Sequence, residues 1–358
     1  MTPELSICIP TYNRCELLAR SLDVALLQSS ELPVEICISN NASSDDTEDL
    51  LRSLARIHRR LRVENRAQNI GIDRNILAAV RMARGRHVLP IGDDEMFAPG
   101  AIASILAALR SQPDLMILNG RYVERGCFSG PRLAENLQGR TITSLLDAFV
   151  LLWDKMPLGS FAAPRGYASP RFADRYLGTH HAYSGAVWDF LLAGFKYTGR
   201  VAIVCTREPL IEFHRVEKAW AADSGAIHFE QIPRWFDLLP EYYKAAAVVG
   251  RREFQGRCAT AAQLIHFRAA RQISRANVSV WFRTFGFWAR LRAHAAALLP
   301  TRAAAAAVRL AMVAHALLRA VSRLISTPVS ATENSVALSG DAARTSARAT
   351  SPEARLNP

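Results

Sequence analysis

The segment Val-Leu-Pro-Ile-Gly-Asp-Asp-Glu, residues 88–95, joins a short apolar run to three consecutive acids. The apolar part has the length of a buried strand, and the amphipathic pattern over 101–110 predicts a helix soon after it. In α/β proteins, ligands bind where strands end. Adjacent carboxylates at such a place repel one another unless a cation or hydrogen bonds offset them, and their hard oxygens suit Mg²⁺ or Mn²⁺. The alternative interpretation is a solvated acidic turn that caps the following helix.

Strand-like and helix-like segments alternate on both sides of these acids. Short apolar runs predict strands over residues 5–10, 34–39, 61–64, 88–91, 115–119 and 197–206. Amphipathic spacing predicts helices between them, over residues 14–28, 47–60, 72–83, 101–110 and 183–193. Alternation at this spacing indicates βαβ units with right-handed crossovers. We therefore expect an α/β fold with a mostly parallel sheet.

The composition indicates a folded protein without a membrane span. Half of the 358 residues are hydrophobic, and the six cysteines are scattered with no CxxC pair, as is typical of reduced, cytosolic thiols. The N-terminus runs directly into the first strand, which leaves no room for a signal peptide. No uncharged apolar run reaches the roughly 18 residues that a membrane span needs. We expect a soluble or peripheral protein.

The net charge of +12 is concentrated in the C-terminal part of the chain. Residues 254–332 contain no acid, and they contain eleven arginines. Beyond Trp235 the sequence is alanine-rich and predicts two amphipathic helices, one of them with Arg268, Arg271 and Arg275 along one side. Basic amphipathic helices with nearby aromatic residues are typical of segments that bind an anionic membrane surface. The alternative is a helical subdomain that packs on the core with an arginine-rich outer face.

These patterns predict three parts. Residues 1–235 would form the α/β domain, with halves at 1–123 and 124–235. Residues 236–325 would form the basic helical region. Residues 326–358 are rich in Ser, Thr, Ala and Pro and lack aromatics, which predicts a disordered tail.

Four motifs occur in a fixed order: Ser-Ile-Cys-Ile-Pro-Thr-Tyr-Asn-Arg (6–14), Glu-Ile-Cys-Ile-Ser-Asn-Asn-Ala-Ser-Ser-Asp-Asp-Thr (35–47), Asn-Ile-Gly-Ile-Asp-Arg-Asn (69–75) and Gly-Asp-Asp-Glu (92–95). Together they resemble the family 2 glycosyltransferases, in particular the abequosyl- and rhamnosyltransferase-like members that build bacterial surface polysaccharides. The resemblance ends after Val123. It implies the GT-A nucleotide-sugar-binding fold and a metal-dependent, inverting transfer of one sugar. The implied acceptor is a saccharide, such as a lipid-linked O-antigen or capsule intermediate.

The resemblance also implies where the donor binds. It places the nucleotide base near the end of the first strand, the diphosphate or ribose near Arg74, and the ribose at Asp93. Asn40 stands where the family usually has Asp, and its amide oxygen can accept a hydrogen bond without carrying the charge. The implied donor-binding residues are Pro10, Thr11, Tyr12, Arg14, Asn40, Arg74 and Asp93.

The metal would lie at the acidic segment. Asp93 and Asp94 resemble the family's DXD-type acids, and Asp94 would ligate Mg²⁺ or Mn²⁺. Glu95 is a plausible further or water-mediated ligand, and His214 could complete the shell from a neighbouring strand.

The general base departs from the family pattern. The usual Glu-Asp pair falls at Ala186-Val187, which cannot take up a proton. Asp189 is the nearest carboxylate and the first candidate. His180 and His181 are the alternatives, because an imidazole titrates near neutral pH, and Asp174 ranks third.

Three functions other than sugar transfer are also compatible with an α/β fold or a basic charge. A GT-A-fold scaffold that binds nucleotide sugars without transferring them is the main rival, because the Glu-Asp pair is missing. A nucleic-acid-binding role is disfavoured because no RNA or DNA module is recognised. A nicotinamide-binding enzyme is disfavoured because no GxGxxG follows the first strand. The expected partners are a nucleotide sugar, a saccharide acceptor and an anionic membrane, on the cytoplasmic, inner face of the plasma membrane.

Overall fold

The computed structural model describes residues 2–124, 127–214 and 221–326. The chain divides into two units, residues 1–308 and residues 309–358. The predicted tail, 326–358, lies outside the described residues except for Ser326. The predicted boundaries at 235 and 325 remain predictions.

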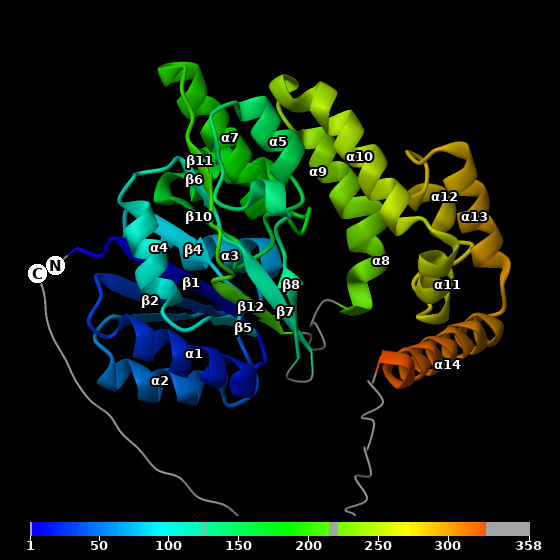
Figure 1. Ribbon diagram of the computed structural model, residues 1–358, viewed down its shortest axis with the longest axis horizontal. Coiled ribbons are helices and arrows are strands. Elements are labelled where there is room, and N and C mark those ends of the chain that lie inside the picture. Colours follow the sequence, from blue (N-terminus) through cyan, green and yellow to red (C-terminus); the bar gives the residue numbers. More distant parts are fainter. Residues whose placement is uncertain (1, 125–126, 215–220, 327–358) are drawn as a thin grey trace, which may run out of the picture. The chain divides into compact units, whose positions relative to one another are not determined.

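The first unit is built on a central sheet (Figure 1). Among the described residues it has eight strands, in the order β3 (Leu61–Asn65), β2 (Val34–Asn40), β1 (Leu5–Thr11), β4 (His87–Pro90), β10 (Phe161–Pro164), β6 (Leu115–Ile117), β11 (Ile203–Cys205) and β9 (Thr141–Ile142). Strands β10 and β9 run antiparallel to their neighbours, and the others are parallel to one another. The predicted α/β class with a mostly parallel sheet is confirmed.

A second, smaller sheet continues from the acidic segment. Its described strands follow the order β5 (Glu95–Phe97), β12 (Ile211–His214), β7 (Gly120–Glu124) and β8 (Cys127–Pro131). Strand β12 is antiparallel to β5 and parallel to β7. The chain segment after the three acids is therefore held by a strand from more than a hundred residues later.

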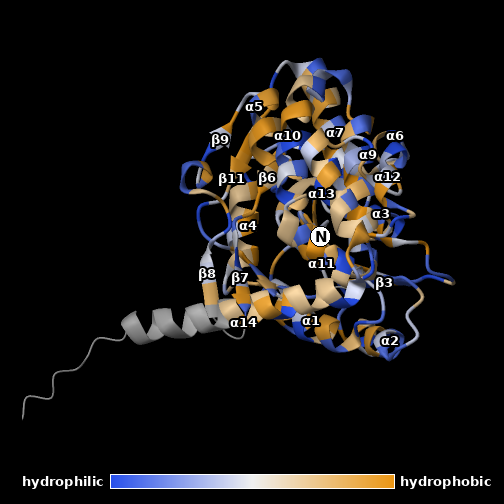
Figure 2. Cartoon of the chain, turned by 90° about the vertical axis from the view of Figure 1, so that its right-hand side faces the viewer, coloured by the Kyte–Doolittle hydropathy of each residue, from blue (hydrophilic) through white to orange (hydrophobic). Residues whose placement is uncertain are grey.

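Helices cover both faces of the central sheet. One core contains side chains of α1 (Cys15–Ser29), α2 (Thr47–Ile57) and α4 (Ala101–Leu109). The other contains side chains of α3 (Ile72–Arg81), α5 (Leu145–Leu152) and α7 (Ala182–Thr198). On β1, Leu5, Ile7 and Ile9 enter the first core while Cys8 enters the second, because successive side chains of a strand point to opposite faces. Figure 2 shows the hydrophobic residues of α4 and α5.

The C-terminal part is helical, as predicted. It contains α8 (Ser224–Ala226), α9 (Ile232–Leu238), α10 (Lys244–Cys258), α11 (Ala261–Ala269), α12 (Val278–Trp281), α13 (Phe287–Leu298) and α14 (Thr301–Ser326), and α6 (Pro170–Ala173) lies earlier in the chain. The predicted stripe of Arg268, Arg271 and Arg275 on one helix is wrong. Helix α11 ends at Ala269, and Arg271 has a positive φ of 61° in the turn that follows.

The strand predicted over 197–206 is shorter than expected. Helix α7 continues to Thr198 and ends at Gly199, which has a φ of 67° in the left-handed region that glycine adopts without strain. Strand β11 occupies only Ile203–Cys205.

A helix that spans a membrane needs roughly 20 consecutive, mostly apolar residues. Within the described part of the chain, no single helix is long and apolar enough to cross a membrane. One bent pair, Phe287–Leu298 with Thr301–Ala314, meets the length and composition test jointly.

Candidate active site

The carboxyl ends of the parallel strands meet at one edge of the sheet. Thr11, the last residue of β1, pairs with Asn40 of β2, and Cys8 pairs with Pro90 of β4. A cleft of about 730 Å³ lies at this edge. It is lined by many of the predicted site residues, namely Pro10, Thr11, Tyr12, Arg14, Arg74, Asp93, Asp94, Glu95, His180 and His181. Three others, Asn40, Asp189 and His214, are not among the described residues that line it.

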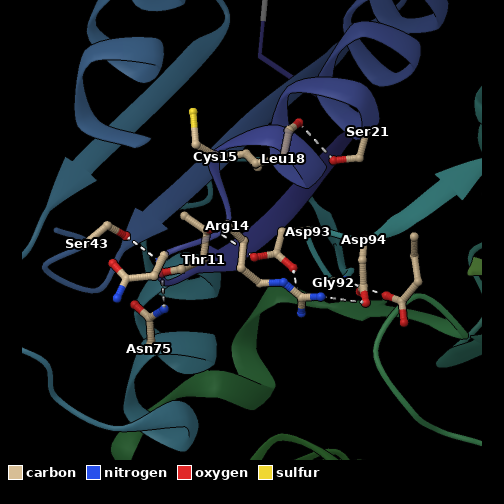
Figure 3. Close-up of polar contacts among 12 residues, drawn as sticks. Thr11, Arg14, Cys15, Leu18, Ser21, Ser43, Asn75, Gly92, Asp93 and Asp94 are labelled. Carbon is tan, nitrogen blue, oxygen red and sulfur yellow. Dashed lines mark hydrogen bonds and ion pairs between the residues drawn. The ribbon is translucent and has the colours of Figure 1, made fainter. Parts of the chain in front are cut away.

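Arg14 lies between the two aspartates of the acidic segment (Figure 3). Its Nη1 is 3.4 Å from Asp93 Oδ1, and its Nη2 is 3.3 Å from Asp94 Oδ2. Thr11 Oγ1 also donates to Asp93 Oδ2 at 2.8 Å, and the Gly92 N–H donates to Glu95 Oε2 at 2.6 Å. Both aspartates are at most 5% exposed, and buried neighbouring carboxylates require positive charge or hydrogen bonds beside them. In this structure Arg14 supplies that charge.

The donor set at the acidic segment suits a hard divalent cation. Asp94 and Glu95 offer carboxylate oxygens, the ligands that Mg²⁺ and Mn²⁺ prefer. Among the described residues, no three His, Cys, Asp or Glu side chains gather as a metal-ligating group. An ion held here by the protein through one or two carboxylates would take its other ligands from substrate phosphates and water, as Mg²⁺ commonly does.

His214 does not join the acids. Phe213, not His214, is the residue opposite Glu95 in the antiparallel β5–β12 pair, and the next side chain on a strand points to the other face. The His214 Nε2 is buried, makes no hydrogen bond among the described residues and lies 3.9 Å from Glu212 Oε2.

In the motif at residues 35–47, Asn41 lines the cleft, whereas Asn40 does not. The Asn40 amide donates to Asn65 Oδ1 at 3.0 Å, and its carbonyl oxygen accepts from Ser43 Oγ at 2.6 Å. Asn41 lines the cleft, and its Nδ2 donates to Asn69 Oδ1 at 2.9 Å. Sequence reasoning missed Asn41, although it belongs to the same polar run.

Asn75 adds a further polar group to the cleft. Its Nδ2 donates to the Thr11 carbonyl oxygen at 3.4 Å. Its Oδ1 is buried and has no hydrogen-bond partner among the described residues. A buried acceptor without a donor is costly unless a ligand supplies one. Asn75 is therefore well suited to accept a hydrogen bond from a bound donor molecule.

Asp73 holds the loop that carries the two histidines. Its Oδ2 accepts from the backbone N–H groups of Gly178 at 2.8 Å, Thr179 at 3.1 Å and His180 at 3.1 Å, and its Oδ1 accepts from Ala182 at 3.1 Å. Burial raises the pKa of Asp73, and these four donors act in the opposite direction. Asp73 cannot be singled out from the sequence, because its partners lie more than a hundred residues away.

His180 and His181 are neutral at neutral pH. Burial, together with the neighbouring His228, lowers the pKa of His180 to about 4. Burial and the adjacent His180 and His228 imidazoles lower the pKa of His181 to about 3. Asp223, which is exposed and lines the same cleft, acts in the opposite direction on His180. The Nδ1 of His181 lies 3.4 Å from the Tyr183 hydroxyl oxygen, within hydrogen-bond range.

These shifts predict a loss of stability in mild acid. An unfolded imidazole takes up a proton near pH 6.5, whereas the folded pair resists protonation until about pH 4 and 3, so the unfolded state binds more protons between these limits. The stability is complete above pH 6.5 and is lost as the pH falls. We expect the free energy of unfolding to drop by about 3–4 kcal/mol between pH 7 and pH 5. Urea denaturation of the wild type and His181→Gln tests this: the variant should show a smaller drop, and an equal drop would contradict the assignment.

Asp189 does not line the cleft; its side chain connects α7 to Arg175 and Tyr176. Its Oδ1 accepts from the Tyr176 hydroxyl at 2.8 Å, and its Oδ2 accepts from Arg175 Nε at 2.8 Å and from Arg175 Nη2. Burial raises the pKa of Asp189, and these donors oppose the increase. Both oxygens are thus engaged away from the residues that line the cleft.

Asp189→Asn should therefore destabilise the protein without removing its chemistry. The amide cannot accept both Arg175 bonds, and we expect a loss of about 1–3 kcal/mol of unfolding free energy. The kcat of the folded fraction should be unchanged. A general base would instead lose about 10²–10⁴ in rate on this substitution, so turnover measured beside a denaturation curve separates the two roles.

Comparison with known proteins identifies the N-terminal part of the chain. Residues 6–165 match the family described as glycosyl transferase family 2. The abequosyltransferase RfbV of Salmonella typhimurium is 38% identical over 130 residues, which cover 34% of this chain and 37% of that protein. The chondroitin synthase of Escherichia coli is 32% identical over 113 residues, covering 32% of this chain and 16% of that protein. The chain thus spans well under half the length of these relatives.

Solved structures show the same fold. Residues 1–349 of TarS from S. aureus, crystallised in complex with UDP-GlcNAc, match with a TM-score of 0.51 and 14% identity, over 82% of this chain and 79% of that chain. A second structure of the same TarS segment gives a TM-score of 0.52 with 13% identity, over 82% of this chain and 89% of that one. The GT-A fold expected from the four motifs is confirmed, and residues 6–165 match the family that the motifs resemble.

Proposed function

We propose that this chain, whose residues 6–165 form a glycosyl transferase family 2 domain, moves one sugar from a nucleotide-sugar donor to a saccharide acceptor with inversion and with a divalent metal. The observation that carries the proposal is the buried acid pair at the end of β4, in a cleft shared with Thr11, Tyr12 and Arg14. The abequosyltransferase and chondroitin synthase relatives, and TarS with its UDP-GlcNAc, support the same reaction class.

The donor would bind along the first and third motifs. Tyr12 and Asn75 would contact the base, and Asp93 would accept hydrogen bonds from the ribose. Asp94 and Glu95 would hold Mg²⁺ or Mn²⁺, which offsets the charge that develops on the leaving diphosphate. Arg14 already lies against the acids and can donate to a phosphate oxygen from the same position.

The transfer itself needs a proton acceptor. The acceptor oxygen forms a bond to the anomeric carbon, the bond from that carbon to the phosphate oxygen breaks, and the nucleoside diphosphate leaves. The hydroxyl proton passes to a base, for which we propose His181, with His180 as the alternative. The support for His181 is its position: it lines the cleft, and Asp73 holds the loop that carries it. Burial lowers the pKa of this imidazole to about 3 in the free protein, so it must gain basicity when the charged donor and metal rearrange the site.

The acceptor is proposed to be lipid-linked, because α13 presents an unusual surface. Its buried residues are the small Ala293, Ala296 and Ala297. Its large apolar residues face outward, with Phe287 63%, Trp288 68%, Leu291 50% and Leu298 60% exposed. On a helical wheel the exposed Arg290 and Arg292 flank this face. Large apolar side chains bordered by arginine suit insertion into the headgroup region of an anionic membrane, which would place the protein at the inner face of the plasma membrane.

Vesicle sedimentation tests this surface. We expect binding to vesicles of phosphatidylglycerol and phosphatidylcholine, weaker binding to phosphatidylcholine alone, and release by added salt. Serine at Phe287, Trp288 and Leu291 together should abolish binding. Tyr197→Ser, which alters a 93% exposed residue on α7, is the matched control and should bind as the wild type does. Equal binding by the triple variant would exclude α13 as the membrane contact.

Calorimetric titration tests the donor site. UDP, dTDP, CDP and GDP would be titrated with and without Mg²⁺ or Mn²⁺. We expect metal-dependent binding of one nucleotide, and turnover of the matching nucleotide sugar. Failure of all four with metal present would contradict the transferase proposal, and binding without any turnover would support the non-catalytic scaffold instead.

A further inference from the structure

A second cavity lies next to the cleft of about 730 Å³ described above, which we call the donor cleft. It has a volume of about 460 Å³, within the range of about 300–1,000 Å³ that is usual for small-ligand pockets. Its aromatic lining residues are Tyr122, Trp153, Trp235, Phe254 and Phe267. We refer to it as the aromatic pocket.

The aromatic pocket and the donor cleft share four lining residues, Pro157, His181, His228 and Ile232. The two cavities therefore meet at a pair of imidazoles, one of which is the proposed base. His228 is held there by a 2.7 Å hydrogen bond between its Nδ1 and the Ser224 carbonyl oxygen. Its ring stacks on Phe254, with centroids 6.1 Å apart and an interplanar angle of 14°. A group bound in the pocket can thus extend toward the donor past His181.

The lining chemistry favours a sugar ring. Trp153 and Phe254 are only partly buried, and the negative face of an aromatic ring attracts the polarised C–H groups of a pyranose face. His228 stacks on one face of Phe254, and the Arg257 guanidinium lies 5.4 Å from the centroid of the Trp153 ring, so a sugar would use the remaining ring surface. Polar groups stand beside them. Asp154 and Arg257 form an ion pair at 2.8 Å, and Gln263 also lines the pocket. Trp235 lines the pocket, and its buried Nε1–H has no acceptor among the described residues, a cost that a ligand oxygen would remove.

We propose that the aromatic pocket binds the terminal sugar of the acceptor, with the reactive hydroxyl at the His181–His228 junction. The inference rests on the proposed transfer reaction. It gives the C-terminal helices a second role, because Phe254 and Arg257 of α10 and Gln263 and Phe267 of α11 form part of the wall. These residues lie outside the segment 6–165 that matches the family. The pocket is therefore built jointly by residues inside the family match, such as Trp153 and Asp154, and by helices that the match does not cover.

Saturation-transfer NMR tests the pocket with three probes, the methyl α-glycosides of mannose, galactose and rhamnose. We expect at least one to bind the wild type and to bind Trp153→Ala about tenfold more weakly or not at all, because the stacking surface is removed. Trp153→Phe retains a ring and should retain binding. Trp288→Ala, which removes a 68% exposed tryptophan outside the pocket, is the matched control. Phe254→Leu gives a second test should Trp153→Ala fail to fold.

The titration with UDP, dTDP, CDP and GDP is repeated on the same samples. It tests the donor site independently, so that a failure of the aromatic-pocket proposal can be distinguished from a failure of the transferase proposal. Glycoside binding that depends on Trp153 or Phe254 supports the pocket, whether or not a nucleotide binds. Nucleotide binding with no glycoside binding, or with glycoside binding that neither substitution weakens, overturns the pocket and leaves the donor site standing. Absence of both kinds of binding in the wild type overturns both proposals.

Discussion

Asp94→Asn is expected to abolish sugar transfer and the metal-dependent part of nucleotide binding. The substitution keeps the size of the side chain and removes the charge that would hold the cation and that Arg14 faces in this structure. Loss of one group that stabilises transition-state charge costs about 10²–10³ in rate, and loss of the ion's ligand should cost at least as much. Turnover and calorimetric titration with and without Mg²⁺ or Mn²⁺ measure the two effects.

Asp23→Asn is the matched control for this substitution. Asp23 is an exposed acid on α1, so the same chemical change there should leave transfer and binding at wild-type levels. Retention of full, metal-stimulated transfer by Asp94→Asn would exclude Asp94 as a ligand. Retention of transfer that no longer responds to metal would indicate that Arg14 alone offsets the diphosphate charge.

Asp73→Ala is expected to cause the largest loss of stability among the site variants. It leaves four backbone N–H groups, those of Gly178, Thr179, His180 and Ala182, without their acceptor in a buried region. An unsatisfied buried donor costs about 1–3 kcal/mol, and partial relaxation should hold the total to about 3–5 kcal/mol. Urea denaturation measures this loss, and turnover should fall as well because the loop that carries His180 and His181 loses its anchor.

Asp174→Ala provides the comparison. Asp174 pairs with Arg81 at 3.3 Å, but both side chains are about half exposed, and such surface pairs contribute about 0–1 kcal/mol. A small change in Asp174→Ala beside a large one in Asp73→Ala would support the role of Asp73 in holding the loop. Similar, small changes in both would contradict it.

Local patterns explain which parts of the site could be predicted. Residues 88–95 read correctly as a strand followed by acids because burial on both faces of a central strand leaves a continuous apolar run. The resemblance implies that Thr11, Arg14 and Asp93 lie together, and the topology explains this, because parallel strands that alternate with helices end at the same edge of the sheet. Their contacts follow from this topology.

Long-range contacts explain the rest. Asn40 and Asn41 are adjacent and chemically identical, and only the position of Asn65 and Ser43 beside Asn40 turns it away from the cleft. Asp189 does not line the cleft, because Tyr176 and Arg175 engage both of its oxygens elsewhere.

The sequence by itself determined the α/β fold, the order of the motifs, the acidic segment and the basic C-terminal helices, because each depends on periodicity or composition within a short window. Only the tertiary structure decided that Asp73 anchors the histidine loop, that β12 presents Phe213 to Glu95, and that His181 and His228 meet between two cavities. These features depend on strand register and on packing between helices distant in sequence, where the identity of a residue does not reveal its neighbour.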